Sequence, residues 1–146
     1  MGIGVLVMES HSGMGDKREL RGKILSGVQK AARFTQLDWV REQCMEKLGF
    51  IPFPGTVNLE ITEEDISTLK ALRKEEGIRL IPPDPQFCES KAFPIVMGHI
   101  QGALIIPEEN VRVHGRAVIE IMAPVKVKDA LGLDEGDYLS LRFKKI

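Results

Sequence analysis

The sequence predicts a small, mostly antiparallel β-barrel with short helices inserted between its strands. With 146 residues, 43% of them hydrophobic, the chain is long enough for one well-buried core and short for two. Its apolar segments are short and are separated by Pro and Gly, which is typical of strands joined by turns. The predicted helices are too few to cover both faces of a parallel sheet, so an antiparallel barrel is favoured.

The first half of the chain predicts two strands and a helix between them. Apolar and polar residues alternate over residues 19–27, which predicts a strand. The segment "DWVREQCMEKLG" at residues 38–49 has a helical apolar stripe, with Asp38 as a candidate N-cap and Gly49 as a candidate C-cap. A second strand is expected at residues 56–61, after a Pro-Gly turn.

The rest of the chain predicts a helix and then mainly strands. Residues 62–77 carry an apolar stripe that ends at Gly77, so a second helix is expected there. A short helix is also expected within "VKVKDALGLDEGD", at residues 125–137. The remaining strands are predicted at residues 78–82, 91–100, 102–107, 116–124 and 137–143.

Residues 1–17 are interpreted as an N-terminal appendage to a domain that spans residues 18–146. The apolar run from Ile3 to Met8 is too short for a signal peptide or a transmembrane span. Cys44 and Cys88 lie far apart and belong to no CxxC motif, which indicates reduced cysteines and a cytoplasmic protein. We therefore expect no membrane partner.

The charge balance argues against a nucleic-acid partner. The 20 basic and 21 acidic residues give a net charge of -1, which lacks the basic excess of a nucleic-acid coat or a membrane-surface protein. Motifs of the types GxxxxGK[ST], GxSxG and HExxH are absent from the sequence, and its three histidines are scattered. We expect a monomer.

Thr56 and Asn58 stand two residues apart in "FPGTVNLEI", where a turn leads into a strand. Because side chains alternate along a strand, these two residues face away from the buried side formed by Val57, Leu59 and Ile61. The pair presents two uncharged oxygens in one direction, which could hold a hard cation or could be ordinary decoration of a turn and strand.

Glu120 interrupts the apolar strand "AVIEIMAP" between Ile119 and Ile121. Two interpretations remain open for it. Simple alternation would leave its carboxylate in solvent, whereas a position inside a cavity would give the carboxylate a chemical role.

Three segments, "LRGKILSG", "LGFIPFPGTVNLEI" and "AVIEIMAPVKVKDALGLDEGDYLSL", resemble the archaeal CTP-dependent riboflavin kinase family over roughly residues 20–144. The resemblance implies a mostly β fold with short helices, a six-stranded cradle-loop barrel of the Greek-key, RIFT-like type. It also implies a kinase that transfers the γ-phosphoryl group of CTP to riboflavin and yields FMN and CDP, with Mg²⁺ as cofactor.

The resemblance carries site roles onto residues of this chain. Thr56 and Asn58 match the magnesium ligands of the family's GTxN segment. Glu120 would contact riboflavin and orient or deprotonate its hydroxyl, and Arg112 stands roughly where the family offers a small hydroxyl residue to the flavin. The nucleotide-binding residues would be Gly27, Val28, Gln29, Lys30, Ala31, Ala32 and Arg33, together with Val125, Lys126, Val127 and Lys128. An exposed helix face is the alternative role for these lysines, and it is favoured for Lys128.

The segment "SGVQKAARF" departs from the family's pattern SGxGxGxxF, because Gln29 and Ala31 replace two glycines. Glycines in such a turn let backbone N–H groups approach phosphate closely, whereas here Lys30 and Arg33 add positive charge. An inactive or re-purposed member that binds a nucleotide or flavin is therefore a second hypothesis. A third, a swapped-hairpin DNA-binding regulator, rests on the segment "ALGLDEGD".

Overall fold

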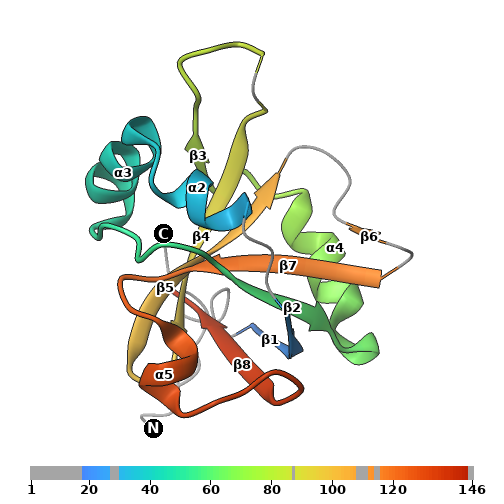
Figure 1. Cartoon of the computed structure of the whole chain (residues 1–146). Coiled ribbons are helices and arrows are strands. Elements are labelled where there is room, and N and C mark those ends of the chain that lie inside the picture. The colour runs from blue at the N-terminus through green and yellow to red at the C-terminus, as the bar shows by residue number, and fades with distance from the viewer. Residues whose placement is uncertain (1–17, 27–29, 87, 108–111, 114–115, 145–146) are drawn as a thin grey trace, which may run out of the picture.

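The computed structural model describes residues 18–26, 30–86, 88–107, 112–113 and 116–144. Six antiparallel strands follow one another in the order β2-β1-β8-β4-β5-β7, and a pairing between β2 and β7 closes them into a barrel (Figure 1). This closure confirms the predicted fold, a mostly β chain with a six-stranded barrel. The barrel strands are β1 (Glu19–Leu25), β2 (Val57–Ile61), β4 (Ser90–Met97), β5 (Ile100–Pro107), β7 (Arg116–Met122) and β8 (Tyr138–Phe143).

Two short strands extend this barrel. Strand β3 (Ile78–Leu80) pairs with the start of β4. It lies within residues 78–82, where a strand was predicted, and is two residues shorter. Strand β6 (Arg112–Val113), which we did not predict, pairs with the start of β7. The strand predicted at residues 91–100 is present, but its predicted end is wrong, because β4 stops at Met97 and the chain turns back. Gly98, with a φ of 61°, permits this tight turn into β5.

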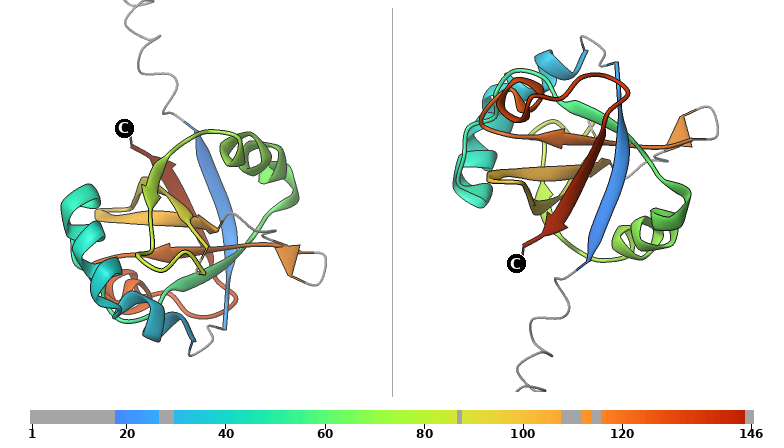
Figure 2. Two further views of the ribbon diagram at one scale, coloured as in Figure 1. Left: turned by 90° about the horizontal axis from the view of Figure 1, so that it is seen from above. Right: turned by 90° about the horizontal axis from the view of Figure 1, so that it is seen from below.

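Short helices lie on two sides of the barrel, with α4 on one side and α2 and α3 on the other (Figure 2). We predicted α4 and α5 but not α2, which takes up the second part of the segment at residues 27–33 that is expected to bind the nucleotide. No helix within the described part of the chain is long and apolar enough to cross a membrane. The helices are α2 (Lys30–Thr35), α3 (Asp38–Gln43), η1 (Cys44–Leu48), η2 (Glu63–Asp65), α4 (Ile66–Arg73) and α5 (Val127–Leu131).

The helix predicted at residues 38–49 is present, but its two halves differ. Its first half is α-helical, and its second half, η1, is a π-helix in which Gly49 N–H donates to Cys44 O at 2.9 Å. Gly49 ends the helix as predicted, with a φ of 84°. Asp38 is not the N-cap, because it is already the first helical residue and Leu37 occupies the cap position without a side-chain hydrogen bond.

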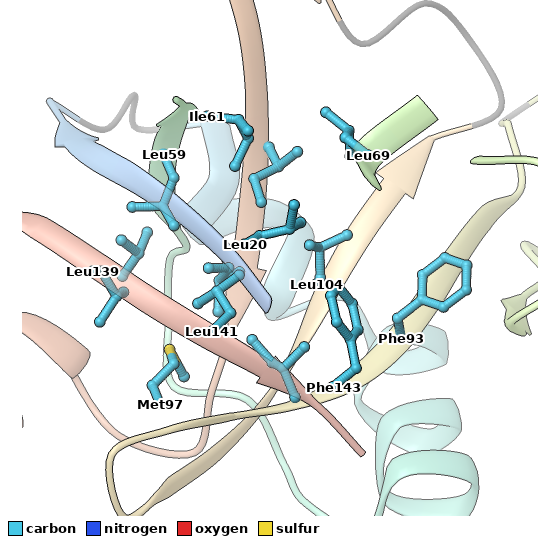
Figure 3. Packing of buried hydrophobic residues seen from close by; sticks show 14 of the residues in the cluster. Leu20, Leu59, Ile61, Leu69, Phe93, Met97, Leu104, Leu139, Leu141 and Phe143 are labelled. Atoms are coloured by element: carbon cyan, nitrogen blue, oxygen red, sulfur yellow. The ribbon is translucent and has the colours of Figure 1, made fainter. Parts of the chain in front are cut away.

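Two apolar clusters lie on opposite faces of the strands. The inner cluster, to which Ile121 belongs, fills the barrel. Leu59 and Leu104 are two of its side chains that Figure 3 shows. The second cluster joins Val40 of α3 to Met122 of β7, the immediate neighbour of Ile121 on the other face of that strand. Because side chains alternate in strands, α3 must pack against the outer face of the barrel wall.

Candidate active site

The Pro-Gly loop before β2 is held from two sides. Phe53 N–H donates to the carbonyl oxygen of Ala123, which follows β7, at 2.8 Å. Gly55 N–H donates to Thr35 Oγ1, at the end of α2, at 2.9 Å. Gly55 has a φ of 102°, a backbone conformation that other residues adopt only with strain. These contacts fix the backbone that leads directly into Thr56.

Barrel closure brings Thr56, Asn58 and Glu120 together. In the pairing of β2 with β7, Asn58 lies opposite Glu120 and Val57 lies opposite Ile121. Thr56 Oγ1 donates a hydrogen bond to Glu120 Oε1 over 2.9 Å, across 64 positions of sequence. Two uncharged oxygen-bearing side chains and one carboxylate therefore form a single polar group at the junction of β2 and β7.

The polar group lies on the outer side of the barrel wall. Asn58 and Glu120 alternate with Leu59 and Ile121, whose side chains fill the barrel, so they point the other way. Glu120 is exposed, as its interpretation as an alternating strand residue requires. Asn58 faces away from the barrel core as predicted, but it is only 9% exposed, so this face of β2 is covered at that position.

A cavity of about 180 Å³ opens beside Thr56. It lies at the end of the barrel where β2 begins and β7 ends, because Val57 and Ile121 both line it and pair with each other. Its other lining residues are Phe53, Pro54, Gly55, Thr56, Ala123, Val125, Lys126, Val127 and Lys128. The cavity therefore joins the segment "PGTV" to the segment "VKVK", and the resemblance gives a binding role to both.

The two lysines at this cavity differ in their surroundings. Lys126 is exposed and its Nζ lies 3.8 Å from Asp129 Oδ2. Lys128 is about one-third exposed, and its Nζ lies 4.0 Å from Glu135 Oε2. Such exposed pairs are weak, so both ammonium groups remain available to an anionic ligand. Val127, between them, is 2% exposed and belongs to the inner apolar cluster, so its side chain has a packing role.

The predicted nucleotide segment is only partly described. Gly27, Val28 and Gln29 lie outside the described residues, whereas Lys30, Ala31, Ala32 and Arg33 form most of α2. Ala31 stands at one of the two replaced glycine positions, and Ala has the highest helix propensity of all residues. The same substitution that removes the glycine pattern thus favours the helix that the structure contains. Arg33 is exposed.

Arg112 is not brought to the cavity by the sheet. Its backbone pairs with Ala117, near the start of β7, whereas the cavity lies at the end of that strand. Its proposed contact with flavin stays a prediction. Thr35, in contrast, was not predicted as a residue of this site. Its local sequence contains no pattern that indicates a contact with Gly55, twenty positions away.

The oxygen ligands at this site fit a magnesium ion better than a transition metal. No group of three or more His, Cys, Asp or Glu side chains that could bind a metal occurs among the residues that the structure describes. Thr56 and Asn58 offer neutral oxygens, and Glu120 adds one carboxylate at hydrogen-bond distance from Thr56. Mg²⁺ keeps several waters and takes further oxygens from substrate phosphates, so it needs few protein ligands.

Comparison with known proteins identifies relatives of this barrel. The family model CTP-dep_RFKase, described as "Domain of unknown function DUF120", matches residues 24–143. A riboflavin kinase of Archaeoglobus fulgidus is 38% identical over 127 residues, which cover 84% of this chain and 53% of the relative. A riboflavin kinase of Methanosarcina barkeri is 37% identical over 134 residues, which cover 89% of this chain and 58% of the relative.

A third relative, from Pyrobaculum aerophilum, extends this comparison. It is also named riboflavin kinase and is 36% identical over 126 residues, which cover 84% of this chain and 59% of the relative. The chain thus spans between half and two-thirds of the length of these three relatives.

Proposed function

This chain belongs to the CTP-dep_RFKase family, the family of the CTP-dependent riboflavin kinase domain, and on that premise we propose that it phosphorylates riboflavin. The reaction transfers the γ-phosphoryl group of CTP to the ribityl 5'-hydroxyl and yields FMN and CDP. The relatives named riboflavin kinase support this proposal, since their similarity covers more than four-fifths of the chain.

One observation carries the proposal beyond the resemblance. The Thr56 hydroxyl donates a hydrogen bond to Glu120, and Asn58 lies opposite Glu120. Thr56 also lines a cavity that two lysines border. Metal ligands, a carboxylate and phosphate-binding cations are the parts that phosphoryl transfer requires, because the protein contributes mainly positioning and electrostatic stabilisation.

Thr56 and Asn58 would hold Mg²⁺ in this reaction. The bound ion supplies charge neutralisation on the phosphate oxygens. Thr56 uses its hydroxyl hydrogen to bond Glu120, so the lone pairs of its oxygen remain free to act as a ligand. Asn58 is nearly buried between its neighbouring strands, which limits its side chain to few orientations.

Glu120 is the candidate catalytic group. A carboxylate has two oxygens, so it can accept the hydrogen bond from Thr56 and still accept one from the ribityl hydroxyl. In that position it orients the hydroxyl oxygen for attack and takes its proton as the bond to phosphorus forms. Lys126 and Lys128 at the cavity border attract the phosphates as mobile point charges.

A second function is favoured by one specific observation. Helix α2 takes up the second half of the segment to which the resemblance assigns a glycine-rich turn, and a helix presents its backbone N–H groups to its own carbonyls rather than to phosphate. A re-purposed member that binds a nucleotide or flavin without phosphoryl transfer would fit this change. Nothing among the described residues favours the DNA-binding hypothesis.

Product formation distinguishes these functions. Purified protein is incubated with riboflavin, Mg²⁺ and either CTP or ATP, and FMN and the nucleoside diphosphate are separated by chromatography. We expect FMN and CDP in equal amounts with CTP, and much less product with ATP. Binding of CTP or riboflavin in calorimetry without FMN would favour the re-purposed member, and neither binding nor product would overturn the proposal.

A further inference from the structure

We propose that Thr35 is a positioning residue that holds the metal ligand Thr56 in place through Gly55. This inference rests on the proposed function, because it assigns a task in Mg²⁺ and nucleotide binding. Thr35 does not line the cavity, so it acts through its neighbour and not by touching the ligand.

Thr35 has the burial of a core residue and the chemistry of a polar one. It is 0% exposed at the end of α2, and a buried hydroxyl is stable only where it has hydrogen-bond partners. Its Oγ1 accepts the N–H of Gly55 at 2.9 Å. A valine of the same shape could not accept this bond and would leave the Gly55 N–H without it.

Gly55 transmits the position of Thr35 to the metal site. It is the residue immediately before Thr56, so a change in its backbone moves the hydroxyl that contacts Glu120. A Cβ built on Gly55 would meet no atom within 4 Å, so the site has room for a side chain. Glycine is required there by its φ of 102°, and the bond to Thr35 helps to hold that conformation.

Among the described residues, Thr35 provides one of two backbone hydrogen bonds that tie the loop to distant segments. The other is the bond from Phe53 N–H to Ala123 O, which ties the loop to the end of β7. Without the Thr35 bond, the loop would, within the described part of the chain, keep its bond to the end of β7 and lose its bond to α2, so the side of the loop that faces α2 could shift. Thr56 would then sample positions in which its oxygen is not directed to the metal.

The same bond links the metal site to the nucleotide segment. Lys30–Thr35 is a single helix, so residues proposed to contact the nucleotide and the residue that holds Gly55 move together. A nucleotide that orders α2 therefore also orders the loop at Thr56. By thermodynamic reciprocity, Mg²⁺ and nucleotide each tighten the binding of the other.

Two variants at one position test the inference. Thr35→Val keeps the branched shape and removes the acceptor, whereas Thr35→Ser keeps the hydroxyl. CTP affinity is measured by calorimetry with saturating Mg²⁺ and again with a chelator, and unfolding of the unliganded variants is followed by circular dichroism. We expect Thr35→Val to lose roughly tenfold in CTP affinity with Mg²⁺ and less than about twofold without it. Thr35→Ser should stay within about twofold of wild type in both conditions.

The outcomes separate the inference from the proposed function. If Thr35→Val and wild type bind CTP equally well in the presence of Mg²⁺, Thr35 has no positioning role. The kinase proposal still stands in that case if the wild-type protein forms FMN. Equal losses in the two variants, with and without Mg²⁺, overturn it in favour of a packing role. If Thr35→Val does not fold, Thr35→Ala is compared with Thr35→Ser by the same criteria. Wild-type protein that neither binds CTP nor forms FMN overturns both proposals.

Discussion

The change Thr56→Val tests the proposed metal ligand with little disturbance of the fold. Valine keeps the branched shape that suits the start of a strand, but it cannot bond Glu120 or offer an oxygen to Mg²⁺. The variant therefore removes two interactions, one present in the unliganded protein and one proposed in the complex. The two losses are measured separately, because thermal unfolding without ligands reports the first and a Mg²⁺ titration reports the second.

The size of the first effect, loss of the hydrogen bond from Thr56 to Glu120, follows from the structure. The bond from Thr56 to Glu120 lies in an exposed environment, so its loss should cost at most about 1 kcal/mol of unfolding free energy. For a chain of this length, that cost corresponds to a Tm decrease of about 2–4 °C. Loss of one of two protein ligands should weaken Mg²⁺ binding in the nucleotide complex at least about tenfold, or about 1.4 kcal/mol.

The assay is a Mg²⁺ titration of FMN formation at saturating CTP and riboflavin, accompanied by thermal unfolding without ligands. Thr56→Ser, which keeps the oxygen, should retain most of the wild-type Mg²⁺ dependence. Thr68→Val is the matched control, since Thr68 is also half-buried but lies on α4. A wild-type Mg²⁺ dependence in Thr56→Val would refute the ligand assignment, and a Tm loss well beyond this range would show a structural role instead.

Two further predictions concern Glu120 and the cysteines. Glu120→Gln should lower kcat by about a hundredfold with little change in the KM for CTP; unchanged turnover would leave Glu120 as a solvated strand residue. Burial raises the pKa of the Cys44 thiol to about 11, whereas Cys88 is exposed. At pH 8 a thiol reagent should therefore modify Cys88 quickly and Cys44 only on unfolding; two fast equivalents would contradict this. Because the unfolded thiol titrates near 9.0, the contribution of Cys44 to stability should be full below pH 9 and be lost as the pH rises towards 11, which denaturant titrations would detect.

Local patterns in the sequence were sufficient for most of the fold. Alternation in β1 and β2 reports which side chains fill the barrel, because the period of a strand depends only on its own backbone. Asn58 is unusual at this place because Asn is a poor strand former, and the resemblance to the kinase family made Thr56 and Asn58 the metal candidates. Two errors, the end of β4 and the cap of α3, are boundary errors, where neighbouring residues fit either state equally well.

Helix α2 shows where local patterns were insufficient. The segment was interpreted through its missing glycines as an altered turn, but a short helix gains most of its stability from packing. In the structure, the last residue of α2 is buried and bonded to Gly55. That contact joins distant segments, and helix propensity alone does not report it.

The sequence by itself determined which residues are chemically suited to the site: a Thr and an Asn two apart, and a carboxylate in an apolar strand. Only the tertiary structure decided that they meet, because the register between β2 and β7 is set by closure of the whole barrel. Closure places Asn58 opposite Glu120 and joins Thr56 to Glu120 across 64 positions. The burial of Asn58 and the support of Gly55 by Thr35 arise in the same way, since both depend on contacts between segments that no local pattern encodes.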